Sequence, residues 1–536
     1  MAVDPPSEDA DEAGGTSSAP GPGGPRGGDE TEAPPASLSA TVARGARLAG
    51  TGYAFSQLLT FVAYLALARL AAPRDFGLFA AGSLVVGVGA VIGESGIEAA
   101  LVQRRHGLEQ ALNAAFVATV AGGVALSFLA LATAPLVQLF FHNHQAGVVA
   151  AVMSASLLLR LMTIVPDALL MRRFSFMRRV VIDPLSTIAF AAGSIPAAAA
   201  GWGVWSLVIG TYASILSTLI GGWVFAGWRP RLGEASLDTW RELARFGRPV
   251  MIGNLIRSFV LQIPVLALGR ARGPSALGQF TYATRTANQP LGAVVNVGGY
   301  VLFPAFSRLS AFDARFRAAV RKALRWLCAI SFPACMLLLP LGAPAVVLVF
   351  GQRWRPAGQA VMILSVYCAA LSLDSIASEA WKASGRTGML PRMHGLSLLL
   401  TAAFVGALVV PFGLIGVAVG MSLSAVGVAA FAVRGMGHAL GIRVGDLVQE
   451  LWPPAAAASV MAAGLFCLEH FVVRADVRGT FAGLVLLAVE SLLGVAVYLA
   501  ILAVFAPETT RELLGRLRGL SARRRDRRRV QPGGAA

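Results

Sequence analysis

Charged side chains are scarce in this sequence. Asp, Glu, Lys and Arg make up only 14% of its 536 residues, while 56% are hydrophobic. A soluble domain usually carries about 25% charged residues, so the composition argues against a soluble protein. Most of the charge also lies in the two tails and in short connections between apolar segments. The sequence therefore predicts a membrane protein.

Residues arranged for catalysis or metal binding are also lacking. The four cysteines lie inside apolar runs without zinc-site spacing, and the six histidines are scattered without an HExxH pattern. There is no GxxxxGK[ST] nucleotide-binding motif in the sequence. We therefore predict that the protein is not an enzyme and that it has no catalytic residues, metal site or cofactor.

The two ends of the chain differ in charge. Residues 1–45 are acidic and rich in Pro, Gly, Ser and Ala, so they cannot bury enough apolar surface to fold, and we expect a disordered tail. Residues 507–536 form a basic tail that we expect to lie against anionic lipid headgroups. The net charge of +17 arises from this tail and from basic loops, so we predict no nucleic-acid partner.

Between the tails lie fourteen apolar runs. Each approaches the roughly 20 residues that a helix needs to cross a bilayer, and only helices or closed barrels satisfy the backbone there. We therefore predict an all-α polytopic protein with about 14 transmembrane helices. The runs lie near residues 48–69, 77–100, 111–134, 147–170, 180–200, 203–226, 247–269, 278–304, 323–349, 357–381, 393–411, 413–433, 453–473 and 480–505.

One stretch of the sequence occurs twice. The segment Leu65–Phe79 recurs as Leu266–Phe280, with seven of fifteen positions identical at a constant shift of 201. In both copies an apolar run ends at an arginine, and a Pro-x-x-x-Gly turn follows. Gly203-Val204 and Gly416-Val417 form a second, weaker sequence match between the two halves of the chain. The identical pairs are Leu65/Leu266, Ala66/Ala267, Leu67/Leu268, Arg69/Arg270, Pro73/Pro274, Gly77/Gly278 and Phe79/Phe280.

This repeat predicts the organisation of the helices. Six spans separate the two copies, so both point the same way across the membrane, as in parallel repeats related by an axis along the membrane normal. We expect an N-lobe at residues 46–228, a C-lobe at residues 229–437, and two extra C-terminal helices at residues 438–506. If the predicted spans cross the membrane in turn, 33 Arg and Lys residues lie on the side of the membrane that holds both termini, and eight lie on the opposite side. The positive-inside rule then makes both termini cytoplasmic.

Four basic residues fall inside the predicted spans: Arg160, Arg257, Arg285 and Lys382. A charge at bilayer depth costs roughly 2.5–3.5 kcal/mol, so it usually faces a cavity or a partner. Arg160 and Arg257 have no acidic residue three or four positions away and belong to different lobes. A guanidinium facing a shared cavity would suit a phosphate or pyrophosphate group. We treat all four as candidate substrate-binding cations, although Lys382 could instead pair with Glu379 on its own helix.

Acidic residues inside the spans are candidates for ion coupling. Burial favours the protonated form of a carboxylate, and on that ground we single out Glu94 and Asp374. For Glu469 we expect a structural role instead, as a partner of nearby Arg474.

Several motifs resemble those of a known family. Pro73–Leu78, Gly96–Gln103, Ala168–Phe176 and Gly201–Val208 resemble segments of bacterial polysaccharide transporters of the MOP superfamily, the O-antigen and exopolysaccharide flippases, in their colanic-acid exporter-like branch. The resemblance spans roughly residues 45–435.

The resemblance implies a function. It implies two lobes around a cavity that opens alternately to each face of the bacterial inner membrane. It also implies transport of an undecaprenyl-diphosphate-linked oligosaccharide, with the last two helices forming a groove for the lipid. Membrane lipids and a polysaccharide polymerase or glycosyltransferase are the candidate partners.

Two other functions stay open. The first is a MATE-type cation-coupled drug antiporter, whose cavity should be acidic or aromatic rather than arginine-bearing. The second is a non-transporting scaffold of a polysaccharide assembly complex. The sequence names neither the sugar nor the coupling ion.

Overall fold

The computed structural model describes residues 38–94, 96–104, 106–173, 181–231, 233, 235–307, 313–507 and 511. The chain divides into two units, residues 1–47 and residues 48–536. In the first unit, the described residues form the beginning of a helix that starts at Leu38, inside the segment predicted as an acidic tail. The rest of that tail lies outside the described residues. All contacts reported below lie within the second unit.

The described part of the chain is helical and contains no strand. This agrees with the predicted all-α fold class. The helices are α1 (Leu38–Leu70), α2 (Pro73–Glu94), α3 (Ile97–Gln103), α4 (Leu108–Phe141), α5 (His144–Ser154), α6 (Ser156–Leu161), α7 (Ile164–Arg172), α8 (Asp183–Ala199), α9 (Val204–Ala226), α10 (Leu237–Ser307), α11 (Ala314–Met336), α12 (Leu338–Phe350), η3 (Gln352–Trp354), α13 (Arg355–Ala383), α14 (Met389–Leu440), α15 (Val444–Leu468), η4 (Glu469–Val473), η5 (Ala475–Val477) and α16 (Thr480–Phe505).

The structure does not confirm the predicted number of membrane spans. Among the described residues, nine helical segments are long and apolar enough to cross a bilayer, or ten if the bent pair α11 and α12 forms one span. The predicted count of fourteen is therefore not confirmed. Two long helices, α10 and α14, each include two of the predicted spans, while α8 has only 17 residues. The protein is nevertheless a multi-pass membrane protein.

Glycines mark the breaks inside the two long helices. Gly273 in α10 has φ +76°, and Gly413 in α14 has φ +57° and ψ −127°. Residues with a Cβ rarely adopt such backbone angles. The turn before α9 contains Gly203 with almost the same angles as Gly413, φ +55° and ψ −125°. The structural equivalent of Gly203 is thus Gly413. The weaker sequence match instead pairs Gly203 with Gly416, three residues later.

The two copies of the sequence repeat touch each other. A Cβ atom added to Gly77 would lie 1.7 Å from the carbonyl oxygen of Pro274, and one added to Gly278 would lie 1.7 Å from that of Pro73. Each glycine therefore packs directly on the backbone of the other copy. This reciprocal contact is what a pseudo-twofold axis between the copies produces, and it explains why both turns need glycine.

From this contact α2 and α10 run antiparallel. A Cβ on Gly87 would lie 3.5 Å from Nε2 of Gln262, and one on Gly96 would lie 2.1 Å from Cα of Gly247. Residue numbers thus rise along α2 as they fall along the first half of α10. These contacts join the segments that the sequence assigns to the two lobes.

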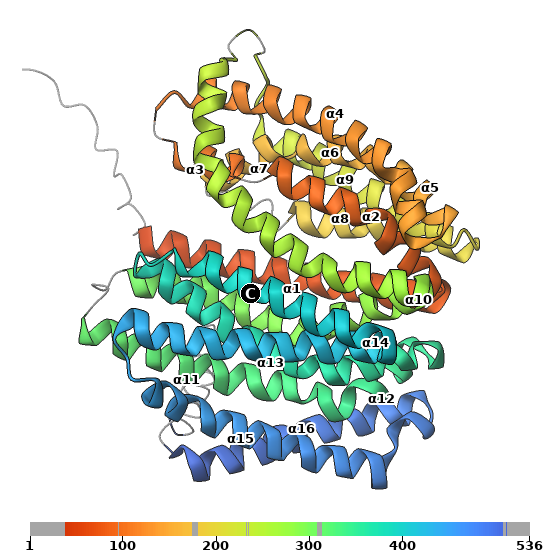
Figure 1. Ribbon diagram of the computed structural model, residues 1–536, viewed down its shortest axis with the longest axis vertical. Coiled ribbons are helices and arrows are strands. Elements are labelled where there is room, and N and C mark those ends of the chain that lie inside the picture. The colour runs from red at the N-terminus through yellow and green to blue at the C-terminus, as the bar shows by residue number, and fades with distance from the viewer. Residues whose placement is uncertain are drawn as a thin grey trace, which may run out of the picture. The chain divides into compact units, whose positions relative to one another are not determined.

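The remaining helices pack in two groups around α10. Helices α2, α4, α5, α6 and α9 contact one another, and α8 lies along α9. Helices α11, α12, α13 and α14 form the second group, with α15 packed against α11 and α16 packed against α15 and α12 (Figure 1). The predicted lobe boundaries near residues 228 and 437 stay predictions.

We expect Gly77→Ala to destabilise the protein. The new Cβ would overlap the backbone of Pro274, so main-chain atoms must move, and overpacking of this kind costs about 1–3 kcal/mol. The measurement is the apparent Tm of purified protein in detergent. Gly122→Ala in α4 is the matched control, because nothing lies within 4 Å of its added Cβ and alanine favours helix. An unchanged Tm for Gly77→Ala would contradict the contact.

Candidate functional site

Two arginines close the end of the bundle where the repeat copies meet. Arg69 in the last turn of α1 donates from Nε to the carbonyl of Val349 and from Nη2 to that of Leu348, both at 2.9 Å. Arg353 donates from Nη2 to the carbonyls of Ala68, at 2.7 Å, and Arg69. The last carbonyls of a helix have no intrahelical partner, and a helix C-terminus attracts cations. Arg69 thus caps the C-terminus of α12, and Arg353 caps the C-terminus of α1.

Further hydrogen bonds hold this closed end together. The buried Trp354 donates from Nε1 to the carbonyl of Ala68 at 3.0 Å. Gln279 of α10 donates to the carbonyl of Arg353 at 2.6 Å and accepts from the N–H of Ala357 at 3.0 Å. Helices α1, α10, α12 and α13 are therefore joined by a continuous network, which we call the closed end.

The predicted cation Arg285 rests on an aromatic stack. Its guanidinium carbon lies 3.3 Å from the ring centroid of Tyr64, a cation–π contact. The same ring stacks on Phe190 of α8, with the ring centroids 5.5 Å apart and an interplanar angle of 14°. The hydroxyl of Tyr282 donates to the Tyr64 carbonyl at 2.7 Å and so fixes α1 beside α10. An aromatic face therefore offsets the charge of Arg285.

The predicted cation Arg160 and the predicted ion-coupling residue Glu94 form one ion pair. Nε of Arg160 in α6 donates to Oε1 of Glu94 at the end of α2. Both side chains are accessible, with 52% of Arg160 and 36% of Glu94 exposed. The sequence offers Arg160 no acidic neighbour on its own helix, and the structure supplies one from another helix.

The local sequence explains why Arg160 lies beside the end of α2. Pro166 has no N–H, so the carbonyl four residues before it lacks a helical partner, and α6 ends near there. The hydroxyl of Thr163 donates to the carbonyl of Arg160 at 2.8 Å, an alternative to the regular helix bond. Gly93 of α2 lets Leu161 pack closely, because a Cβ there would lie 2.4 Å from that side chain. The close approach brings Arg160 beside the end of α2.

Arg257 belongs to a separate charged cluster. Its charge acts on Tyr367 and Asp374 of α13 and on His394 of α14. Lys382 acts on Asp374 and His394 as well. We call these five residues the Arg257 cluster. Within the described residues Arg257 itself makes no ion pair, and Oδ1 of Asp374 is buried without a hydrogen-bond partner.

Lys382 has a partner on its own helix. Its Nζ lies 2.9 Å from Oε1 of Glu379, which confirms the helix-neighbour pair that the sequence spacing indicates. Its role toward a substrate stays a prediction.

The two arginine sites lie at a similar level of the helix pair α2–α10. Along α2, Glu94 lies between the contacts at Gly87 and Gly96; along α10, Arg257 lies between the matching contacts at Gln262 and Gly247. No direct contact joins Arg160 and Arg257 within the described ranges. Arg160 thus lies beside the end of α2, Arg257 lies on α10, and α2 and α10 pack together.

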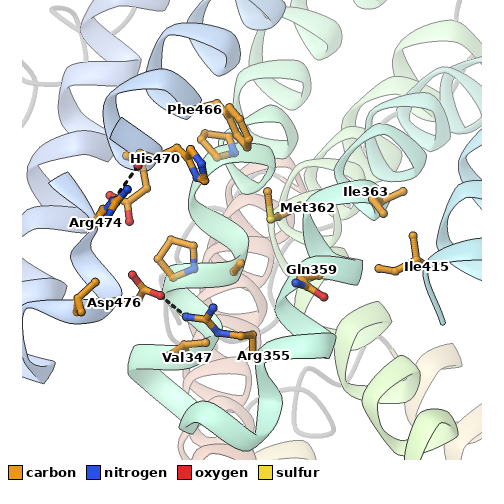
Figure 2. A pocket seen from close by; sticks show the side chains of 15 residues that line it. Val347, Arg355, Gln359, Met362, Ile363, Ile415, Phe466, His470, Arg474 and Asp476 are labelled. Carbon is orange, nitrogen blue, oxygen red and sulfur yellow. Dashed lines mark hydrogen bonds and ion pairs between the residues drawn. The ribbon is translucent and has the colours of Figure 1, made fainter. Parts of the chain in front are cut away.

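A cavity of about 590 Å³ opens among α12, α13, α14, α15 and the short turns η4 and η5. The ion pair between Nη2 of Arg355 and Oδ2 of Asp476, at 2.5 Å, crosses one side of it (Figure 2). The sequence gives little indication of this cavity, because its walls come from four helices and two short turns. Its polar lining residues are Arg355, Gln359, Glu469, His470, Arg474 and Asp476.

The predicted pairing of Glu469 with Arg474 is wrong. Nε of Arg474 donates to the carbonyl of His470 at 3.1 Å, while Oε1 of Glu469 accepts from the N–H of Ala475 at 2.9 Å. The reason is the turn itself, because Arg474 has φ +46° and leads the chain back toward the carboxylate of Glu469.

A second cavity, of about 450 Å³, is a mostly apolar groove among α11, α13, α14 and α15. Arg434 is its charged lining residue. We call this cavity the apolar groove. Its walls include Phe332, Met336, Leu373, Val448, Leu451 and Ala455.

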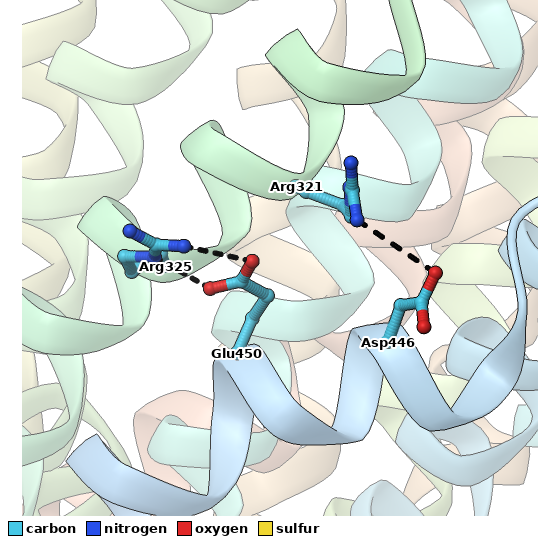
Figure 3. Close-up of polar contacts among 4 residues, drawn as sticks. All are labelled: Arg321, Arg325, Asp446 and Glu450. Atoms are coloured by element: carbon cyan, nitrogen blue, oxygen red, sulfur yellow. Dashed lines mark hydrogen bonds and ion pairs between the residues drawn. The ribbon is translucent and has the colours of Figure 1, made fainter. Parts of the chain in front are cut away.

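Ion pairs hold α15 beside this groove. Arg325 of α11 binds Glu450 of α15 with two bonds, at 2.5 Å from Nε and 2.9 Å from Nη2, and Arg321 lies 3.7 Å from Asp446 (Figure 3). On each helix the two residues are four positions apart, so they share a face. A bidentate arginine–carboxylate pair fixes geometry as well as charge, and it anchors one end of α15 to α11.

Comparison with known proteins gives a consistent result. A family described as "Polysaccharide biosynthesis protein" matches residues 66–359. The succinoglycan biosynthesis transport protein ExoT of Rhizobium meliloti is 27% identical over 308 residues, which cover 58% of this chain and 62% of ExoT, less than two thirds of its length. The lipopolysaccharide biosynthesis protein WzxC of Escherichia coli is 22% identical, covering 68% of this chain and 74% of WzxC.

Solved structures share the fold. The lipid II flippase MurJ in an inward closed conformation aligns with a TM-score of 0.71 at 15% identity, covering 87% of this chain and 99% of MurJ. A multidrug resistance MATE transporter of the MOP superfamily in an inward-facing conformation aligns with a TM-score of 0.58 at 16% identity, covering 78% and 95%. The predicted resemblance to MOP-superfamily transporters is confirmed for the fold. Because the family match extends over more than half of its residues, this chain belongs to the polysaccharide biosynthesis protein family.

Proposed function

We propose that this protein carries a polyprenyl-diphosphate-linked oligosaccharide across the bacterial cytoplasmic membrane by alternating access, without covalent chemistry. Both termini are cytoplasmic in this proposal, as the distribution of basic residues predicts. The transport and biosynthesis roles named for ExoT and WzxC support the substrate class, and the fold supports the mechanism.

One observation carries the proposal: the arginine sites lie far from the closed end. Glu94, the partner of Arg160, follows Gly77 by seventeen residues, and Arg257 precedes Pro274 by the same number. At 1.5 Å per residue each is about 25 Å from the contact between the repeat copies. A bilayer core is about 30 Å thick, so these guanidiniums lie near the headgroup level of the opposite face. That is where the diphosphate of a membrane-bound lipid resides.

The charges at these sites suit an anionic ligand that displaces a carboxylate. Without substrate, Glu94 neutralises Arg160, and Asp374 offsets the charge of Arg257. A diphosphate offers more negative charge and a geometry that a guanidinium grips with two bonds. Its arrival therefore releases Glu94 or Asp374, and protonation of the freed carboxylate is our candidate for ion coupling.

The apolar groove is our candidate for the polyprenyl chain. Apolar side chains from four helices line it, and Arg434 supplies one charge on its wall. The sugar then crosses between the helices while the lipid stays beside α15. A polymerase or glycosyltransferase that uses the exported unit is the candidate partner.

A MATE-type antiporter shares the fold, with a TM-score of 0.58. It would need a cavity that attracts cationic drugs. The exposed Arg160 and Arg257 repel such compounds, so the anionic substrate is favoured.

We expect Arg160→Ala and Arg257→Ala each to reduce export of surface polysaccharide at least tenfold, and the double variant to abolish it, because the diphosphate loses its anchors. The measurement is export in a deletion strain that carries each variant, with lipid-linked repeat units assayed on the inner leaflet and protein quantified in the membrane. Arg241→Ala is the control, an exposed arginine on the same helix α10. Full export by the double variant would refute the role.

A charge exchange separates a structural ion pair from a substrate site. In Arg160→Glu/Glu94→Arg the pair can re-form, so restored export would make its role structural. Continued loss of export supports substrate binding. Drug hypersensitivity of the deletion strain without accumulated lipid would favour the antiporter, and neither effect would favour a scaffold.

We expect Ala430→Trp to block the apolar groove and abolish export, because the indole fills space on its wall. Purified wild-type protein should bind a long-chain polyprenyl diphosphate sugar at least tenfold more tightly than a short-chain analogue, and the variant should lose this preference. Leu399→Trp, at an exposed position of α14 outside the groove, is the control. An unchanged chain-length preference in Ala430→Trp would exclude the groove.

A further inference from the structure

A carboxylate lies in the middle of the buried face of α16. Glu490 is 3% exposed, and no N–H or hydroxyl group among the described residues donates to its carboxylate oxygens. It occupies the face that packs against α12 and α15, where Gly483 lies against Leu348 and Gly494 against Leu465. An ionised carboxylate without hydrogen bonds is costly in such a place. The buried residues of this face are Gly483, Leu487, Glu490, Gly494, Tyr498 and Leu502.

A second buried carboxylate lies beside it. Glu469 is 7% exposed and begins the π-helical turn η4, a type of turn that is frequent at functional sites. Its Oε1 accepts the N–H of Ala475 at 2.9 Å. The two carboxyl groups also interact with each other, through their charges and through a side-chain hydrogen bond. Two adjacent buried carboxylates cannot both be ionised at low cost.

The surrounding charges do not neutralise the pair. Arg355 of α13 is bound to Asp476, and Arg474 is bound to the carbonyl of His470. Arg478 acts on Glu469 from a distance while donating to the carbonyl of Val472 at 3.1 Å, and Asp476 adds a further negative charge. The neighbouring helix α12 has no titratable residue. The charged or titratable groups around the pair are Arg355, His470, Arg474, Asp476 and Arg478.

We propose that Glu469 and Glu490 form a protonation site that holds one proton at neutral pH. The proton resides on Glu490, which has no donor to stabilise its charge, and the negative charge resides on Glu469, which accepts the N–H of Ala475. No covalent change is involved, because only a proton binds and leaves.

The larger cavity gives this proton a path to water. Glu469 lines it together with His470 and Asp476. Figure 2 labels His470 and Asp476 in this cavity. Loss of the proton leaves two negative charges between α15 and α16 and weakens the packing of α16 on its neighbours. A role in driving transport rests on the proposed function, whereas protonation itself does not.

The test is infrared difference spectroscopy of the full-length protein in lipid at neutral pH. The carbonyl stretching band of a protonated carboxyl group, identified by its shift in D₂O, reports the proton. We expect the wild type to show this band, Glu490→Gln to lose the intensity of one carboxyl group, and Glu469→Leu to keep it, because Glu490 then stays buried beside a side chain that cannot donate a hydrogen bond. Asp476→Asn, in the same cavity but ion-paired in the wild type, should also keep it.

An equal band in wild type and Glu490→Gln, or none in the wild type, would overturn the proposal. Sodium-dependent stabilisation that disappears in both Glu490→Gln and Glu469→Leu would also overturn it, in favour of a cation site. If Glu490→Gln does not fold, Glu490→Leu serves instead, since leucine suits a face that already holds Leu487. It should lose the same band and raise the Tm at alkaline pH, where the wild type must give up its proton. Polysaccharide export is a separate readout, so failure of the transport proposal leaves this result interpretable.

Discussion

The structure depends on one close contact, the reciprocal packing of Gly77 and Gly278 on each other's backbones. It requires two similar turns to meet without side chains between them. Once they meet, α2 and the first half of α10 lie antiparallel, and the arginines beside the turns reach the carbonyl ends of α1 and α12. The same sequence pattern that marks a duplication therefore also builds the surface along which its two copies join.

The arginines at the two ends of the α2–α10 contact have different partners. At the closed end, arginines bind backbone carbonyls, while at the far end Arg160 meets Glu94 and Arg257 lies near Asp374. Carbonyl partners are fixed parts of helices, so those contacts are structural. Carboxylates can accept a proton and release their arginine. The difference in partner separates the cations that hold the fold from those we assign to the substrate.

Much of the architecture could be predicted from the sequence. The apolar runs indicate a helical membrane protein, and the repeat indicates two related groups of helices. The positions of Arg160, Arg257 and Lys382 within spans, and the pairing of Lys382 with Glu379, were also accessible, because they depend on local spacing. The ion pair of Arg160 with Glu94 was not, because its partner comes from another helix. The span count is not confirmed, because α10 and α14 each include two of the predicted spans. The role that we propose for Glu490 could not be predicted from the sequence, which shows only an acidic residue in an apolar run. That role depends on the burial of Glu490 beside Glu469, which only the structure reveals.

The mutual caps of Arg69 and Arg353 constrain what can pass through the closed end when it opens. Separating the two helices would strip their last carbonyls of the guanidiniums that now satisfy them. Hydrocarbon offers no hydrogen bonds, so only water can take over. In the transport cycle proposed above, an open state at this end is therefore a wet one, a route for a hydrated sugar from which a polyprenyl chain is excluded.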